Sequence, residues 1–72
     1  MSAKEMFKEL GYEVEFNHNK CMSYIRNNKQ IIRFLKGIKV IEMINKDEYE
    51  FAYELDLLKA INKQVEELGW NE

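Results

Sequence analysis

Apolar residues recur at helical spacing at the start of the chain. Those that share this spacing are Ala3, Met6, Phe7 and Leu10. Positions i, i+3, i+4 and i+7 lie on one face of an α-helix, so the pattern predicts an amphipathic helix. Ser2 and Glu5 have the spacing of a capping box, which places the first helical residue at Ala3. Gly11 is expected to end this helix in the left-handed conformation, which glycine adopts at little cost.

The far end of the chain repeats this arrangement. Apolar residues of the second helix share one side, and they are Leu57, Leu58, Ile61, Val65 and Leu68. Asp56 is the predicted N-cap, because its side-chain oxygen can accept a hydrogen bond from the first turn. Gly69 is the predicted stop, with Trp70 folding back onto Val65 as Tyr12 folds back onto Phe7 after Gly11.

Between the two helices the hydrophobic period changes to two. Tyr12, Val14 and Phe16 alternate with Glu13 and Glu15, which is typical of a half-buried strand. Further strands are predicted at residues 21–27, 30–35 and 38–44, separated by turns rich in Asn, Lys and Gly. Residues 49–54 alternate in the same way and predict a fifth strand, although this stretch could instead begin the final helix early.

These elements predict an α+β fold in one domain, residues 1–72. The order is an N-terminal helix, an antiparallel meander of four to five strands and a C-terminal helix, because connections of two to four residues favour hairpins. Two amphipathic helices need one apolar sheet face to cover. We therefore expect both helices on the same side of the sheet.

The inner strands are apolar on both faces, so the sheet face without helices is expected to be partly apolar and to bind a partner. Alternation from the predicted helix-covered residues Tyr12, Val14 and Phe16 assigns positions to this second face. The predicted partner-binding residues are Ile31, Arg33, Ile41, Met43, Lys39 and Arg26. Arg33, Lys39 and the acids of the strands form the charged rim of this apolar patch. Such a surface has the hydrophobic centre and charged edge of a protein interface.

Composition agrees with a folded chain rather than a disordered one, since 46% of the 72 residues are apolar and 12% are aromatic. Cys21 is the only cysteine, which rules out an internal disulfide and fits a reducing cytoplasm. The charged N-terminal segment does not resemble a signal peptide, and no apolar run approaches the roughly 18 residues of a membrane span. The expectation is a cytoplasmic protein without a membrane partner.

Charge is unevenly distributed although the net charge is only −2. Residues 18–46 carry seven Lys or Arg and a single acid, Glu42, whereas residues 47–72 carry eight acids and two lysines. Basic residues interleaved with Tyr24 and Phe34 on adjoining strands offer a second possibility, a nucleic-acid-binding sheet. The sequence pI of about 5.4 argues against it, because phosphate contacts require a strongly basic surface.

Catalytic equipment is nearly absent from the sequence. His18 and Cys21 are three residues apart, but no second Cys or His completes the three or four ligands of a zinc site. A Cys–His nucleophilic pair lacks any further partner, and the glycines at 11, 37 and 69 form no phosphate-binding loop. We expect no enzymatic activity, no metal and no cofactor.

Two segments carry a resemblance to known proteins. The opening segment 2–12, Ser-Ala-Lys-Glu-Met-Phe-Lys-Glu-Leu-Gly-Tyr, and the closing segment 57–70, Leu-Leu-Lys-Ala-Ile-Asn-Lys-Gln-Val-Glu-Glu-Leu-Gly-Trp, resemble the ends of small uncharacterised proteins of phages and prophages of Gram-positive bacteria. The resemblance spans these two segments and leaves the middle strands unmatched. It implies an accessory phage protein made in the bacterial cytoplasm, and proteins of this kind often inhibit a host protein, including defence systems in the manner of anti-CRISPR proteins.

Three functions follow as expectations. The leading one is a non-enzymatic protein-binding module that binds a host or phage protein, with inhibition of a host or defence protein as the specific expectation. The alternative is a nucleic-acid-binding accessory protein that uses the basic middle strands. The third is a homodimer in which the apolar sheet faces of two copies pair.

Overall fold

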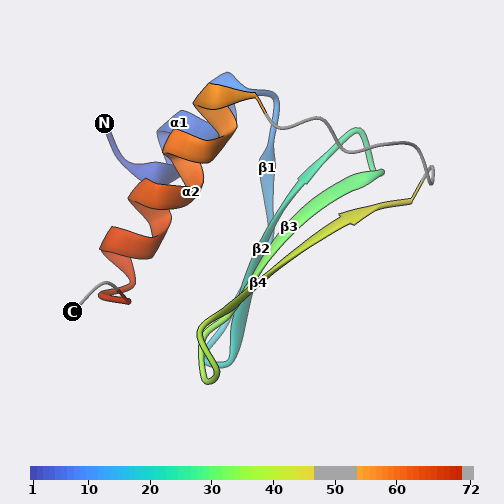
Figure 1. The fold of residues 1–72 in the computed structure, drawn as a ribbon. Coiled ribbons are helices and arrows are strands. Elements are labelled where there is room, and N and C mark those ends of the chain that lie inside the picture. Colours follow the sequence, from blue (N-terminus) through green and yellow to red (C-terminus); the bar gives the residue numbers. More distant parts are fainter. Residues whose placement is uncertain (47–53, 71–72) are drawn as a thin grey trace.

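The computed structural model describes residues 1–46 and 54–70 and confirms the α+β fold (Figure 1). Its elements are α1 (Ala3–Glu9), β1 (Glu13–Asn17), β2 (Cys21–Arg26), β3 (Gln30–Leu35), β4 (Val40–Asn45) and α2 (Leu55–Glu67). The four strands pair in the order β1-β2-β3-β4, each antiparallel to its neighbour. Both helices pack on one side of this meander, and both ends of the chain lie on that side. None of the helices described is long and apolar enough to cross a membrane.

The predicted capping of α1 is confirmed. The Ser2 hydroxyl accepts from the Glu5 amide at 3.2 Å, and the Glu5 carboxylate accepts from the Ser2 amide at 2.9 Å. These hydrogen bonds lower the pKa of the Glu5 carboxyl, because they stabilise its charged form. Gly11 has the expected positive φ of 89°, and the Tyr12 amide donates back to the Phe7 carbonyl at 3.0 Å.

The C-terminal helix begins two residues earlier than predicted. Leu55 is its first residue, and Glu54 stands at the N-cap in extended conformation without a side-chain cap bond. The assignment of Asp56 as N-cap is therefore wrong, and Asp56 lies in the first turn, where its charge still complements the helix dipole. The predicted fifth strand at 49–54 lies outside the described residues except for Glu54. At the other end Gly69 has φ 74° and the Trp70 amide donates to the Val65 carbonyl.

Residues with positive φ shape two of the hairpin turns. Asn27 and Asn28 have φ of 55° and 57°, and the Lys29 amide donates to the Arg26 carbonyl at 3.1 Å. Two left-handed central residues define a type I′ turn, whose twist matches the flanking strands. In the next turn it is Lys39, not glycine, that has the positive φ, and β4 consequently starts at Val40 rather than at residue 38.

The core lies between the helices and the sheet and is rich in aromatic rings. Phe7 of α1 stacks on Tyr24 of β2 with ring centroids 3.9 Å apart, and its ring meets Tyr12 and Phe34 edge to face. Trp70 adds a tilted contact with Phe34. Side chains from all the elements except β1 join this cluster, including Met22, Ile32, Leu57, Ala60 and Ile61. Burial of these large apolar surfaces is the main stabilising force in so short a chain.

A β-bulge breaks the simple alternation of β1. Val14 lies opposite Tyr24, but Phe16 lies opposite Ser23, so the register shifts by one residue at Glu15. The extra residue reverses the side on which the following side chains lie. Phe16 therefore faces away from the helices, and the prediction that it shares a face with Tyr12 and Val14 is wrong.

The predicted side of two β4 residues is also wrong. Ile41 pairs with Phe34 and Met43 pairs with Ile32, and both Ile41 and Met43 pack against the helix-side core. The four-residue turn between β3 and β4 pairs odd-numbered positions of β3 with even-numbered positions of β4, because Leu35 lies opposite Val40. Side chains that lie opposite each other share a sheet face, so Val40, Glu42 and Ile44 are the β4 residues on the other side.

Candidate functional site

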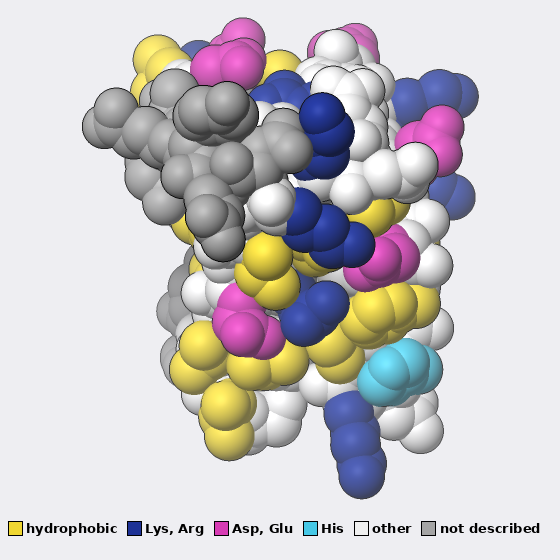
Figure 2. Space-filling view, turned by 90° about the vertical axis from the view of Figure 1, so that its right-hand side faces the viewer, with side chains coloured by type: hydrophobic (Ala, Val, Ile, Leu, Met, Phe, Trp, Pro, Cys, Tyr) yellow, Lys and Arg dark blue, Asp and Glu magenta, His cyan; other side chains and the backbone are white. Residues whose placement is uncertain are grey.

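The sheet face without helices is the first candidate site. We call it the open face and define it by the side chains that alternate with the core residues, namely Glu13 and Phe16 of β1, Cys21, Ser23 and Ile25 of β2, Ile31, Arg33 and Leu35 of β3, and Val40, Glu42 and Ile44 of β4. Figure 2 shows this face, where hydrophobic side chains surround a few charged ones.

Arg33 lies at the centre of the open face. Its strand neighbours across the sheet are Ser23 on one side and Glu42 on the other. The guanidinium is 3.8 Å from the Glu42 carboxylate, and its carbon lies 5.7 Å from the centre of the Phe16 ring. The Arg33 Nε is buried and donates no hydrogen bond to any residue the structure describes. The contact of the guanidinium with Glu42 is long, and 28% of the Arg33 side chain is exposed. The exposed nitrogens can therefore donate to a further acceptor.

Two aromatic rings flank Arg33 on the β1 side. Phe16 stacks on His18 with ring centroids 5.4 Å apart and an interplanar angle of 13°. The His18 Nδ1 accepts from the Lys20 amide at 3.3 Å, which holds the imidazole in the β1–β2 turn. Phe16 reaches the open face only because of the bulge, so sequence alternation placed it on the opposite side.

A polar contact lies beside Arg33 on the neighbouring strands. The Ser23 hydroxyl, whose residue is fully buried, donates to the Glu15 carboxylate at 2.6 Å. Glu15 is the bulge residue, so this hydrogen bond ties the irregular part of β1 to the centre of the sheet. Ile31 and Cys21 are also buried on this face, at 3% and 9% exposure, and form part of its apolar floor.

The open face is apolar on both sides of the Arg33–Glu42 pair. Leu35 and Val40 lie opposite each other toward the β3–β4 turn, and Ile31 and Ile44 lie opposite each other toward the other end. Val40 is 42% exposed, and Ile38 in the turn is 69% exposed. An apolar surface around one arginine has the composition of an interaction centre, since aromatic residues and arginine are enriched there.

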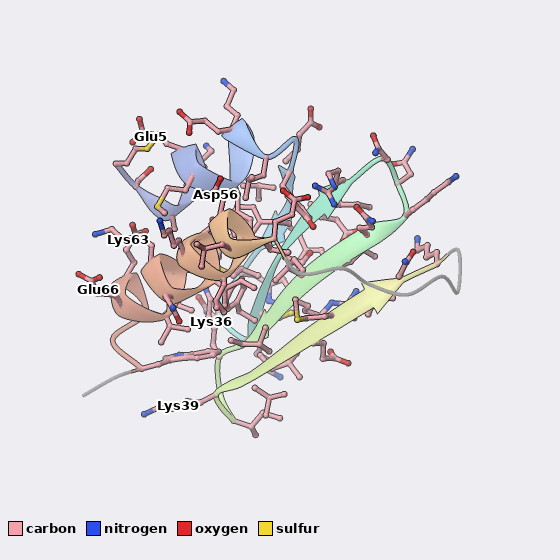
Figure 3. The ribbon with its side chains drawn as sticks, turned by 45° about the horizontal axis from the view of Figure 1, so that its top comes forward. Glu5, Lys36, Lys39, Asp56, Lys63 and Glu66 are labelled. Atoms are coloured by element: carbon pink, nitrogen blue, oxygen red, sulfur yellow. The ribbon has the colours of Figure 1, made fainter. Side chains whose placement is uncertain are left out.

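Of the six predicted partner-binding residues, the structure brings only Ile31 and Arg33 together on the open face. Ile41 and Met43 pack under α2, and Lys39 extends from the β3–β4 turn toward the helix side (Figure 3). Arg26 also lies on the helix side. Sequence reasoning missed Glu42 as the partner of Arg33, although the only acid between residues 18 and 46 is a signal for a basic neighbour.

Arg26 has a structural role on the helix side. Its guanidinium lies 4.7 Å from the centre of the Tyr12 ring, donates to the Leu10 carbonyl at 3.2 Å and is 3.8 Å from the Glu54 carboxylate. It also donates to the Gln30 side chain. These contacts tie β2 to the end of α1 and the start of α2, and they place Arg26 on the helix side of the sheet rather than on the open face with Ile31 and Arg33.

The His18–Cys21 pair is explained by hairpin geometry. The His18 amide donates to the Cys21 carbonyl at 2.9 Å, which closes the β1–β2 turn. Within residues 1–46 and 54–70, no three His, Cys, Asp or Glu side chains gather to hold a metal ion. The sequence expectation of no enzymatic activity stays a prediction.

Comparison with protein-family models, with curated proteins and with solved structures gives no match to this chain. Function is therefore argued from the geometry of the described residues.

Proposed function

We propose that this chain is a protein-binding module whose open face binds a partner protein that offers a carboxylate to Arg33. The observation that supports it is the state of Arg33 at the centre of an apolar sheet face, with 28% of its side chain exposed and a long contact of 3.8 Å to Glu42. The exposed guanidinium nitrogens can donate to a carboxylate of a partner, and charge-assisted hydrogen bonds of this kind are stronger than neutral ones.

The surroundings of Arg33 support a protein partner. Phe16, Leu35, Val40 and Ile44 provide apolar contact area on both sides of the guanidinium, and arginine beside aromatic rings is typical of interface hot spots. Exclusion of water by these neighbours strengthens the charge-assisted hydrogen bond that a carboxylate forms with the guanidinium. In a bacterial cytoplasm the partner we propose is a host or defence protein that the chain inhibits.

Surface variants test this proposal. Arg33→Glu reverses the central charge, Val40→Asp places a charge in the exposed apolar part, and Lys63→Glu on α2 is the matched control for charge reversal, since Lys63 lies on the side of α2 away from the sheet (Figure 3). Each variant is immobilised, used to capture proteins from a bacterial lysate, and checked by circular dichroism. The captured protein is then purified and its Kd measured by calorimetry.

We expect Arg33→Glu and Val40→Asp to weaken binding of the purified partner by at least about tenfold, which corresponds to about 1.4 kcal/mol, and Lys63→Glu to bind as the wild type does. Equal binding by all four proteins contradicts the proposal. Sedimentation gives a second contradiction, because a wild-type dimer that Arg33→Glu dissociates makes the open face a contact between two copies.

Nucleic-acid binding is the second candidate function, favoured by the Phe16–His18 stack beside Arg33. Tyr24 and Phe34, the aromatic residues interleaved with the basic residues of the middle strands, are buried in the core and offer no stacking surface. Retention on single-stranded DNA at low salt and then at about 0.2 M tests this function, because phosphate-dominated binding falls steeply with salt. Retention that His18→Ala and Arg33→Ala abolish would support it over protein binding.

A further inference from the structure

A groove runs along the edge of the sheet at β1, on the opposite side of the sheet from the open face. One hollow of about 420 Å³ lies between α1 and the start of β1, and a second of about 380 Å³ continues toward the end of α2. Lys4, Val14 and Tyr24 line both hollows. These shared residues join the two hollows into one groove, which we call the β1 groove.

The floor of the β1 groove is apolar. Val14 is 40% exposed there, and Tyr24 and Met22 beneath it belong to the core. Leu68 of α2 lines the far part. Neither helix covers Val14 completely, so the floor is open above it. An apolar side chain of a partner placed there would extend the core.

The rim of the β1 groove is basic, although the whole chain is acidic. Lys4 and Lys8 lie one turn apart on α1 and make no ion pair with any residue in the described ranges, and Lys36 closes the far end. The Lys36 ammonium donates to the Asn17 side chain at 2.9 Å and to the His18 carbonyl at 2.8 Å. Of the acids that line the groove, Glu67 accepts from the Ala3 amide at 2.8 Å, and Glu13 lies opposite Ile25, whose side chain is on the open face.

β1 is also an edge strand. Its inner side pairs with β2, and no strand in residues 1–46 or 54–70 pairs with its outer side. An edge of this kind offers unpaired amides and carbonyls to an added strand. The bulge at Glu15 interrupts the edge, so regular pairing is available to the residues before it, Glu13 and Val14, which are the part of β1 that lines the larger hollow.

We propose that the β1 groove binds an extended acidic segment of a partner protein, which pairs with β1 at Glu13 and Val14. An apolar side chain of this segment lies over Val14 and Tyr24, and an acidic side chain two residues away pairs with Lys4 or Lys8. Apolar and acidic residues two positions apart fit this geometry, because side chains at i and i+2 of a strand lie on the same side of the sheet. This site is separate from Arg33 and does not depend on the open face.

Two peptide libraries serve as the probe. Both are fluorescein-labelled hexapeptides with Val, Ile, Phe or Tyr at position 3 and Ser or Thr at positions 2, 4 and 6. Positions 1 and 5, which share a face with position 3, carry Asp or Glu in one library and Lys in the other. Binding to the full chain is measured by anisotropy at low salt. We expect the acidic library to bind and the lysine library to bind at least about tenfold more weakly, since like charges at a rim disfavour association.

Charge-reversal variants locate the site. Lys4→Glu and Lys8→Glu should each weaken binding of the acidic library several-fold, and together abolish it, whereas Lys59→Glu on α2 makes the same charge change away from the groove and should bind as the wild type does. Arg33→Glu should also bind normally, which separates this proposal from the role of the open face. Binding that Lys59→Glu weakens as much as Lys4→Glu does would be a general charge effect and would overturn the proposal.

Backbone pairing has its own readout. In amide hydrogen exchange followed by NMR, the acidic library should slow exchange at whichever of the Glu13 and Val14 amides faces the free edge, because adjacent residues of a strand direct their amides to opposite edges. The same library with N-methylated backbones should bind more weakly. Equal binding of the two libraries, failure of the acidic library to bind, or protection confined to residues outside the β1 groove each overturns the proposal.

Discussion

The Tyr24 hydroxyl donates a hydrogen bond of 2.6 Å to the Gln64 side-chain oxygen inside the core. The bond joins β2 to α2, two elements that are far apart in the sequence, and both residues are almost fully buried. A polar contact in an apolar core fixes how the helix sits on the sheet, because only one arrangement satisfies both groups.

Removal of one partner should therefore cost more than removal of both. Gln64→Leu leaves a buried hydroxyl without an acceptor and should lower the free energy of unfolding by about 1–3 kcal/mol. The double variant Tyr24→Phe with Gln64→Leu should be more stable than the sum of the two single losses predicts. Urea denaturation of the four proteins measures this coupling, and additive losses would show that the hydrogen bond carries no stability of its own.

Ionisation of Tyr24 should lower the free energy of unfolding at alkaline pH. Burial raises the pKa of Tyr24 to about 12, above the value of about 10 that tyrosine has in an unfolded chain. A pKa raised in the folded state gives stability that is complete below about pH 10 and is lost as the pH rises toward 12. Denaturation midpoints between pH 9 and 12 should fall more steeply for the wild type than for Tyr24→Phe, and parallel curves would contradict this.

The two glycine stops should be the least replaceable glycines. Gly69→Val forces a β-branched residue into a φ of 74° and should destabilise by more than about 1 kcal/mol. Gly11→Val should cost a similar amount for the same reason, since its φ is 89°, while an added Cβ would make only an ordinary contact with the Arg26 side chain at 3.4 Å. Gly37→Ala is the control, since Gly37 has no positive φ and open space around it. An unchanged midpoint for Gly69→Val would refute the capping role.

A charge placed in the core should destabilise the fold, whereas a charge placed in the exposed β3–β4 turn should not. Ile41→Asp buries a carboxylate against the core cluster and should destabilise by about 2 kcal/mol or more. Ile38→Asp, in the exposed turn, should leave the unfolding midpoint nearly unchanged. Chemical denaturation distinguishes them, and a stable Ile41→Asp variant would mean that Ile41 is not part of the core.

Sequence reasoning succeeded where structure is decided locally. The capping box of Ser2 and Glu5 depends on residues three apart, and the positive φ of Gly11 and Gly69 depends on the absence of a side chain. The order of elements followed from hydrophobic periods, which change where helix gives way to strand. These signals need no knowledge of distant partners.

Sequence reasoning failed where a position depends on register. The side of Phe16 is set by an extra residue at Glu15, and the side of Ile41 is set by the length of the turn before β4. Neither the bulge nor the turn length can be predicted from the hydrophobic pattern, because the inner strands are apolar on both faces. The Arg33–Glu42 contact depends on the same register, so only the arginine could be named in advance.

The bulge at Glu15 changes the side of the sheet on which the following β1 side chains lie. Residues before it, Tyr12 and Val14, belong to the helix side, and Phe16 after it belongs to the other side. The apolar side chains of this strand thereby lie on two separate surfaces, the β1 groove and the open face. A regular strand of the same sequence would place all of them on the helix side. Deletion of Glu15 would therefore move Phe16 away from Arg33 and back to the helix side. The open face would then lose the aromatic ring that contacts Arg33.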